Sequence, residues 1–185
     1  MQFKFLALAT SLLAASSVQA AAIPADTAVT KAVAALTKIA TQSDALTTSI
    51  NKLKPTNILT NGFTVLTDLT KLFGTVGTGT TAVGVPALTA NTASLDNQAL
   101  LCTTINKVTT SLTSLLTALN NQLSIIAGSL LAIPLQVVVG LLSTAVNGLN
   151  TQVVVASPSC AAGTDANFDL LTTLFNTLTL TNTSP

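Results

Sequence analysis

Few side chains in this sequence could do chemistry. The only carboxylate side chains are six aspartates and the only thiols are two cysteines, and the chain has no His, Glu, Arg, Trp or Tyr. A serine or cysteine nucleophile needs a neighbouring base, so neither a Ser-His-Asp nor a Cys-His arrangement can be assembled. The aspartates are Asp26, Asp44, Asp68, Asp96, Asp165 and Asp169.

Two aspartates could in principle hydrolyse a glycosidic bond, which uses a pair of carboxyl groups. However, Asp26, Asp96 and Asp165 fall at the expected starts of helices, where capping explains a carboxylate. Asp169 follows Asp165 by one helical turn and is explained as part of a solvated face. The chain also lacks the ligands of a zinc site. The stretch from Gly74 to Gly84 lacks the Lys and the strand-to-helix context of a phosphate-binding loop. We predict a protein that is not an enzyme and uses no cofactor or metal.

Residues 1–20 have the features of a secretory signal peptide. Lys4 gives a positive start, Phe5 to Ala15 form an apolar run, and Val18-Gln19-Ala20 is a small-x-small cleavage site. The remainder, 21–185, is long enough for one domain with a core. We therefore expect a secreted protein, extracellular or in the cell wall.

Secretion also predicts a bond between Cys102 and Cys160, because an even pair of cysteines usually bonds in an oxidising compartment. Two buried free thiols are the alternative. The mature chain would carry six Lys and six Asp, which provides no basic field for nucleic acid. Its polarity comes from Thr, Ser, Asn and Gln, so O-linked sugar is plausible, and Asn182 begins an N-linked sequon. We expect a glycoprotein with no nucleic-acid partner.

The elements that position these residues are helices, because apolar residues recur every three to four positions in five segments. The sequence predicts an all-α fold, an antiparallel bundle of about five amphipathic helices with one long central helix. A Thr-rich all-β wall protein is the alternative, but strict alternation is nearly absent. The expected helices run from Asp26 to Lys54, Leu59 to Phe73, Ser94 to about Ile133, Pro134 to about Ala156, and Thr164 or Asp165 to Leu178, with a Gly-rich loop at 74–86.

Leu123 to Val146 is uncharged and long enough to cross a bilayer. We interpret it instead as two packed helices meeting at Pro134, because its apolar stripe leaves a polar face. Membrane spans are usually flanked by Lys or Arg on the cytoplasmic side, and neither follows Lys107. We predict no transmembrane span.

Aliphatic stripes and a few aromatic side chains remain as candidates for function. Core packing explains them most simply. They could also line a cavity between helices or contact a lipid or an apolar surface. The candidate lipid- or surface-contacting residues are Phe63, Phe73, Leu142, Phe168 and Phe175.

The order of segments resembles a fungal family, the hydrophobic surface-binding protein A type with the related antigenic cell-wall galactomannoproteins. The resemblance rests on the signal MQFKFLALATSLLAASSVQA, the helix from Asp26 to Lys54, the Gly-containing loop, and Leu-, Thr- and Ala-rich helices through Leu178. It implies a helical bundle that adsorbs to hydrophobic surfaces, with cell-wall polysaccharide or a secreted polyester hydrolase as partner. In the galactomannoprotein branch it implies fatty-acid binding. The absence of Glu here argues against recruiting a partner by charge.

Three hypotheses follow. The first is a secreted, non-catalytic protein that adsorbs to hydrophobic surfaces or sits in the cell wall through amphipathic helix faces. The second is a soluble carrier of fatty acids or similar lipids in a cavity between helices. The third is a structural wall protein without a ligand.

Overall fold

A computed structural model of the chain describes residues 25–85 and 94–180. These residues form six helices and no strand, which confirms the all-α prediction. The helices are α2 (Ala25–Ile50), α3 (Ile58–Val83), α5 (Leu95–Asn121), α6 (Leu123–Ala127), α7 (Ala132–Ala156) and α8 (Pro158–Leu180). The predicted signal peptide at 1–20 and the sequon at Asn182 lie outside the described residues.

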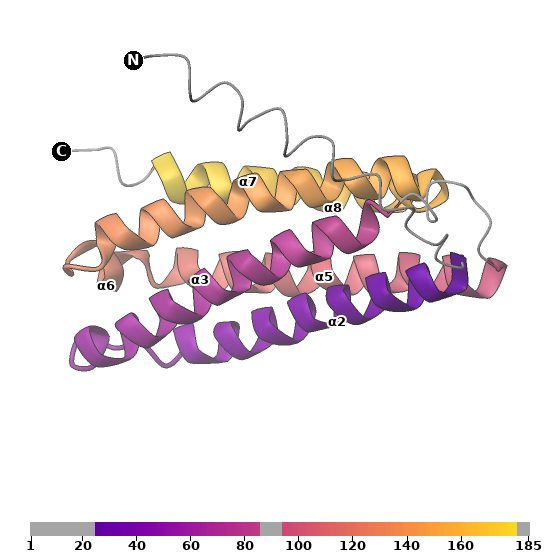
Figure 1. Cartoon of the computed structure of the whole chain (residues 1–185). Coiled ribbons are helices and arrows are strands. Elements are labelled where there is room, and N and C mark those ends of the chain that lie inside the picture. The colour runs from indigo at the N-terminus through magenta and orange to yellow at the C-terminus, as the bar shows by residue number, and fades with distance from the viewer. Residues whose placement is uncertain (1–24, 86–93, 181–185) are drawn as a thin grey trace, which may run out of the picture.

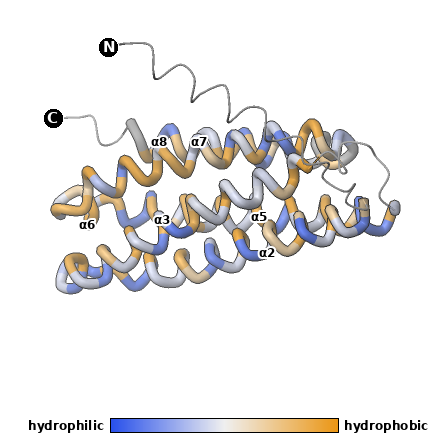
Figure 2. Tube along the Cα trace, in the orientation of Figure 1, coloured by the Kyte–Doolittle hydropathy of each residue, from blue (hydrophilic) through white to orange (hydrophobic). Residues whose placement is uncertain are grey.

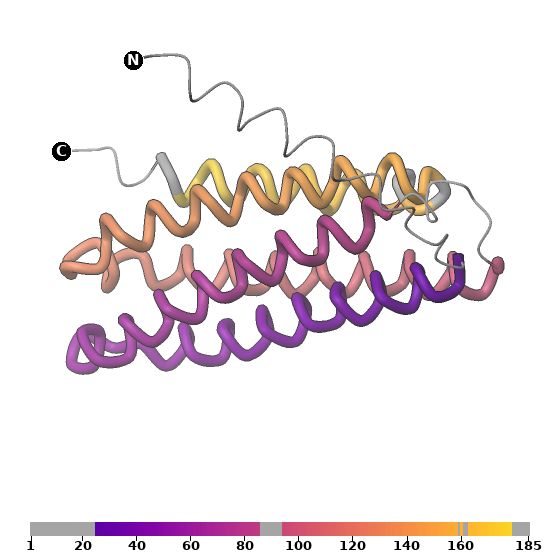
Figure 3. The backbone as a smooth tube through the Cα atoms, viewed as in Figure 1, coloured from indigo at the N-terminus to yellow at the C-terminus, as the bar shows by residue number. Residues whose placement is uncertain are grey.

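The five long helices close into a ring. Helix α2 packs on α3 and α5, α3 on α7, α7 on α8, and α8 on α5. Each long helix runs opposite to the long helix before it in the chain (Figures 1 and 3). Three of the ring contacts nevertheless join parallel helices, namely α2 with α5, α3 with α7, and α5 with α8. The ring therefore has two ends. Helix α6 lies at one end, and α5 and α8 begin at the other.

One apolar stripe from each long helix fills the ring. In α2, for example, Leu36, Ile39 and Ile50 are fully buried, and in α5 Leu112 and Leu115 are. Along α2 and α3, hydrophobic and hydrophilic residues alternate every few positions (Figure 2). This is the three-to-four periodicity from which the helices were predicted.

Helix α3 continues to Val83, so the predicted Gly-rich loop at 74–86 is wrong for residues 74–83. Gly79 is buried, and a Cβ atom there would lie 2.6 Å from Ile39 Cδ1. This glycine therefore permits close packing of α3 on α2 instead of breaking the helix. The hydroxyls of Thr78 and Thr81 donate to the carbonyls of Gly74 and Gly77 at 3.1 Å, so these side chains are satisfied within the helix.

The central segment breaks earlier than predicted. Helix α5 begins as expected, with Ser94 Oγ accepting from the Asn97 amide at 3.4 Å, but it ends at Asn121 instead of near Ile133. The turn predicted at Pro134 lies at residues 128–131, where Ser129 Oγ donates to the Ile126 carbonyl at 2.7 Å and accepts from the Leu131 amide at 3.2 Å. Pro134 falls in the first turn of α7, as predicted.

Helix α8 begins at Pro158, several residues before the predicted caps Thr164 and Asp165. Only Ser157 separates it from α7. Pro158 suits the first helical position because its missing amide would have no helical partner there. Thr164 lies inside the helix, and its hydroxyl donates to the Cys160 carbonyl at 3.1 Å.

Candidate functional site

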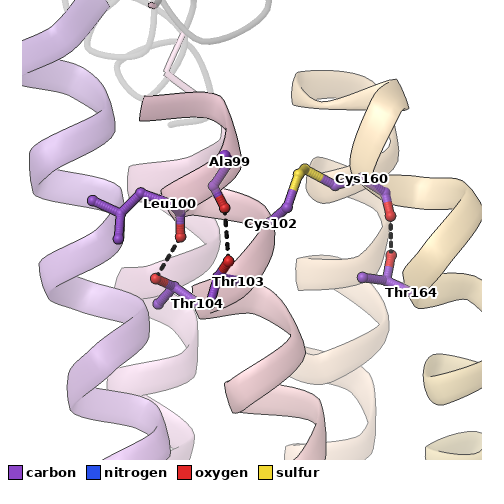
Figure 4. Close-up of a disulfide and its surroundings, with 7 residues drawn as sticks. All are labelled: Ala99, Leu100, Cys102, Thr103, Thr104, Cys160 and Thr164. Carbon is purple, nitrogen blue, oxygen red and sulfur yellow. Dashed lines mark hydrogen bonds between the residues drawn. A yellow bond between two sulfur atoms is a disulfide. The ribbon is translucent and has the colours of Figure 1, made fainter. Parts of the chain in front are cut away.

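A disulfide joins Cys102 of α5 to Cys160 of α8, which confirms the predicted pair. The two Cα atoms are 5.2 Å apart although 58 positions separate them in the chain. Figure 4 shows the bond between the second turn of α5 and the first turn of α8. The disulfide therefore fixes the end of the ring that is remote from α6.

Two of the aspartates make structural contacts in the part of the chain that is described. Asp26 Oδ1 accepts from Asn97 Nδ2 at 2.6 Å, which joins the start of α2 to the start of α5. Asp68 pairs with Lys71 at 2.8 Å, one helical turn away. Within residues 25–85 and 94–180, no group of three or more Cys or Asp side chains could hold a metal ion.

The structure does not bring the predicted lipid-contacting residues into one site. Phe168, Phe175 and Leu142 are buried in the core, and Phe73 is partly buried against it. Only Phe63 is well exposed, at 54%. The three core side chains could meet a ligand only if the helices separated.

A different set of apolar side chains gathers at the α6 end and forms what we call the apolar patch. On the outer face of α7 and the turn before it, the exposed residues follow helical spacing. Leu130 is 84% and Ile133 is 76% exposed. The patch consists of Leu59 and Phe63 at the start of α3, with Leu130, Ile133, Val137 and Leu141.

The two parts of the apolar patch lie on either side of one helix contact. Gly62, between Leu59 and Phe63, packs against the side chain of Leu131. Leu131 in turn lies between Leu130 and Ile133 in the chain. At the far end of the same parallel pair, a Cβ atom on Gly84 would touch the Gln152 side chain. The register is therefore constant along α3 and α7 and keeps the two helix starts side by side.

Charge is distributed unevenly around the ring. There is no charged residue between Lys107 and Asp165, so α6 and α7 carry none. Five of the lysines lie on α2, on α3 or in the turn between them, and two of these line a groove of about 360 Å³ on the α2–α3 face. Helix α2 is not a ring neighbour of α7. The molecule thus has a charged α2–α3 face and an uncharged α7 face.

Below the apolar patch, the core holds an apolar space of about 10 Å³. Its walls come from α5, α6, α7 and α8, with Leu119, Leu123, Leu135, Gln136, Val139 and Leu178 as lining residues. A site for a lipid-sized ligand usually measures several hundred Å³. In this conformation this space is therefore far too small to hold a lipid chain.

Helix α7 is the one described helix that is long and apolar enough to cross a membrane, by length and composition only. Only 28% of its most apolar window is buried. Leu135, Leu142 and Leu149 nevertheless face the core of the ring. The unburied apolar residues of α7 include three members of the patch, Ile133, Val137 and Leu141. These residues contribute to the high hydropathy of the helix.

Sequence reasoning missed most of the apolar patch. The sequence predicted a helix from Ser94 to about Ile133 that would contain Leu130, but α5 ends at Asn121 and Leu130 lies in an exposed turn. A signal was present in the sequence, because Ile133, Val137 and Leu141 form a second apolar stripe beside the buried one. That stripe could have indicated an exposed apolar face.

Comparisons with known proteins give one informative result. No protein-family profile matches the chain, and no curated protein sequence is significantly similar to it. Among solved structures, the fold is similar to that of AfMP4p, whose crystal structure is a complex with palmitic acid. The TM-score is 0.71 at 11% sequence identity, over 84% of this chain and 99% of that chain. At this identity the likeness establishes a shared fold.

Proposed function

We propose that this protein binds long aliphatic chains, such as those of fatty acids, and does so without catalysing a reaction. The observation that carries the proposal is the apolar patch of six exposed large hydrophobic side chains, four of which lie on α7 and the turn before it, where the chain carries no charge. Contiguous exposed apolar area of this kind marks interaction sites for lipids, membranes or proteins. The absence of His, Glu and Arg supports a binding role.

The fold favours a lipid over a protein as the partner. AfMP4p has a similar fold, with a TM-score of 0.71, and its crystal structure is a complex with palmitic acid. A fatty acid presents one flexible apolar chain, and each buried CH₂ contributes about 0.8 kcal/mol. The uncharged α7 face lets such a chain bind without stripping water from a charged group, which would be costly.

Fatty-acid binding can be tested with the fluorescent cis-parinaric acid. The protein has no Trp or Tyr, so the probe can be excited without protein background. We expect saturable binding of the probe, displacement by palmitate, and weaker displacement by shorter acids. Affinity that is independent of chain length would contradict recognition of the aliphatic chain.

Adsorption to hydrophobic surfaces is the second candidate function, and the exposure of the apolar patch specifically favours it. An exposed patch can contact an extended apolar surface without any opening of the ring. In this case we propose a secreted protein, in the cell wall or outside the cell, in which sugar on the Thr-rich surface maintains solubility. A partner such as a polysaccharide or a polyester hydrolase would then be secondary to the surface itself.

The two functions differ in what they leave in solution. A carrier should bind about one chain per molecule and remain dissolved. An adsorbing protein should leave solution when an alkane-coated surface is added, whether or not fatty acid is present. Measuring depletion from solution beside the parinaric acid titration distinguishes the two.

A further inference from the structure

We propose that a fatty-acid chain enters the ring at its α6 end, through an opening closed by residues 122–131, which we call the α6 segment. This inference rests on the proposed fatty-acid binding and names the site at which it occurs. The apolar space in the core at this end measures about 10 Å³, which is far too small to hold a lipid chain. A chain can therefore enter only if part of the wall moves.

Helix α6, the helical part of this segment, has few contacts with other helices. Its main helix contact is with α5, from which it continues in the chain. Ser124, Ala127 and Gly128 are exposed, whereas Ile126 and Leu131 are buried. The segment that covers the apolar space is therefore held by the buried Ile126 and Leu131, by Leu123 and Ile125, which are partly buried against the core, and by the Ser129 turn.

Leu131 acts as the latch of this segment. Its side chain lies against Gly62 of α3, in space that any side chain at position 62 would occupy. Because Gly62 has no side chain, no side chain at that position blocks the movement of Leu131. The Leu131 side chain can leave this space by rotating as the turn at 128–131 moves, while its carbonyl, which accepts from the Leu135 amide at 3.0 Å, keeps it joined to the start of α7.

The opening would connect two apolar regions that are now separate. The apolar patch lies outside the segment, on Leu130 and the outer face of α7. The apolar space lies inside it, against Leu123 and Leu135. A chain that first lands on the patch would pass from apolar surface to apolar core when the segment moves.

Polar groups at the same place suit the head of a fatty acid. Gln122 joins α5 to α6, and its side-chain oxygen is buried without a hydrogen-bond partner among the described residues. Gln136 lines the apolar space. The unpartnered Gln122 oxygen can only accept, so it suits the O–H of a protonated carboxyl group or of a hydroxyl. The ligand class is therefore a single aliphatic chain with a carboxyl or hydroxyl head.

The other end of the ring is held more firmly. The disulfide between Cys102 and Cys160 joins α5 to α8 there, and Asp26 bonds to Asn97 between α2 and α5. Helix separation at that end would have to break these links. This contrast favours the α6 end as the entrance.

A removable lock on the latch tests the inference. The double variant Gly62→Cys/Leu131→Cys should form a second disulfide that holds the α6 segment on α3, confirmed by peptide mapping. We expect oxidised double variant to take up cis-parinaric acid about tenfold more slowly than wild type, because locking lowers the competent fraction. Reduction should restore the rate. Wild type with and without reductant controls for the native disulfide.

A second variant tests the same inference if the double-cysteine variant does not fold. Leu131→Ala removes the latch and should speed uptake, whereas Leu95→Ala, an exposed leucine at the opposite end, should not. Uptake at the wild-type rate by both the oxidised lock and Leu131→Ala overturns this entrance while fatty-acid binding stands. No probe binding by wild type overturns the binding function and the entrance together.

Discussion

The side chain of Leu131 lies against the backbone of Gly62, in the space that a side chain at position 62 would fill. This contact sets the register of α3 against α7, and the two halves of the apolar patch lie on either side of it. It also makes position 62 differ from Gly74, where an added Cβ atom would meet nothing within 4 Å.

The two glycines should respond in opposite ways to alanine. Gly74→Ala should stabilise the protein by about 0.5–1 kcal/mol, because alanine is the better helix former. Gly62→Ala should be about 1–3 kcal/mol less stable than Gly74→Ala, because its methyl group displaces Leu131. Urea unfolding followed by circular dichroism measures both. Equal stabilisation by both substitutions would show that Leu131 is not confined.

Reducing the bond between Cys102 and Cys160 should lower the free energy of unfolding by about 4 kcal/mol, according to the chain-entropy model for a loop of this length. The double variant Cys102→Ser/Cys160→Ser should reproduce the reduced protein. The measurement compares urea midpoints with and without reductant. Coincident unfolding curves would mean that the bond adds no stability to the ring.

Leu142 is fully buried in the core, although its residue type and position allowed a lipid-contacting role. Leu142→Ala should destabilise the protein by about 2–5 kcal/mol, as expected for a large-to-small change in a packed core. Thermal unfolding gives the change. A cost below about 0.5 kcal/mol, the range of surface substitutions, would contradict this packing.

Much of the fold follows from local patterns in the sequence. The five long helices were predictable because their buried stripes repeat every three to four residues, and the cap at Ser94 because its side chain acts within its own turn. The disulfide was predictable because only two cysteines exist. These features depend on neighbours in the chain or on a simple count.

Features that depend on neighbours in space were missed. Gly79 suggested a loop, yet its role is set by Ile39 of another helix. Leu130 and Val137 are as apolar as core residues, and only the order of helices around the ring leaves them exposed. Phe168 and Phe175 were candidates for function because they are aromatic, but they lie on the side of α8 that packs into the core. Candidate sites therefore required the tertiary structure.

Adsorption through the apolar patch should not depend on attraction between charges. Sulfate salts favour the removal of apolar area from water, so binding to an alkane-coated surface should persist or strengthen as sulfate is added. Charge-driven binding would weaken instead, since the Debye length falls to about 3 Å at 1 M salt. A quartz microbalance at low and high sulfate separates these cases. Desorption at high salt would assign binding to the lysine-bearing α2–α3 face.

The most direct test of lipid binding through the apolar patch compares two variants of α7 and its preceding turn. Leu130→Ser/Ile133→Ser/Val137→Ser removes half of the patch, and Val154→Ser/Val155→Ser changes exposed valines at the other end of the same helix. Both should fold as wild type does, because the substituted side chains are largely exposed. We predict that the first variant loses at least about tenfold in affinity for palmitate, which corresponds to 1.4 kcal/mol, and that the second binds as wild type does. Equal affinity of both variants would contradict a lipid-binding role for the apolar patch.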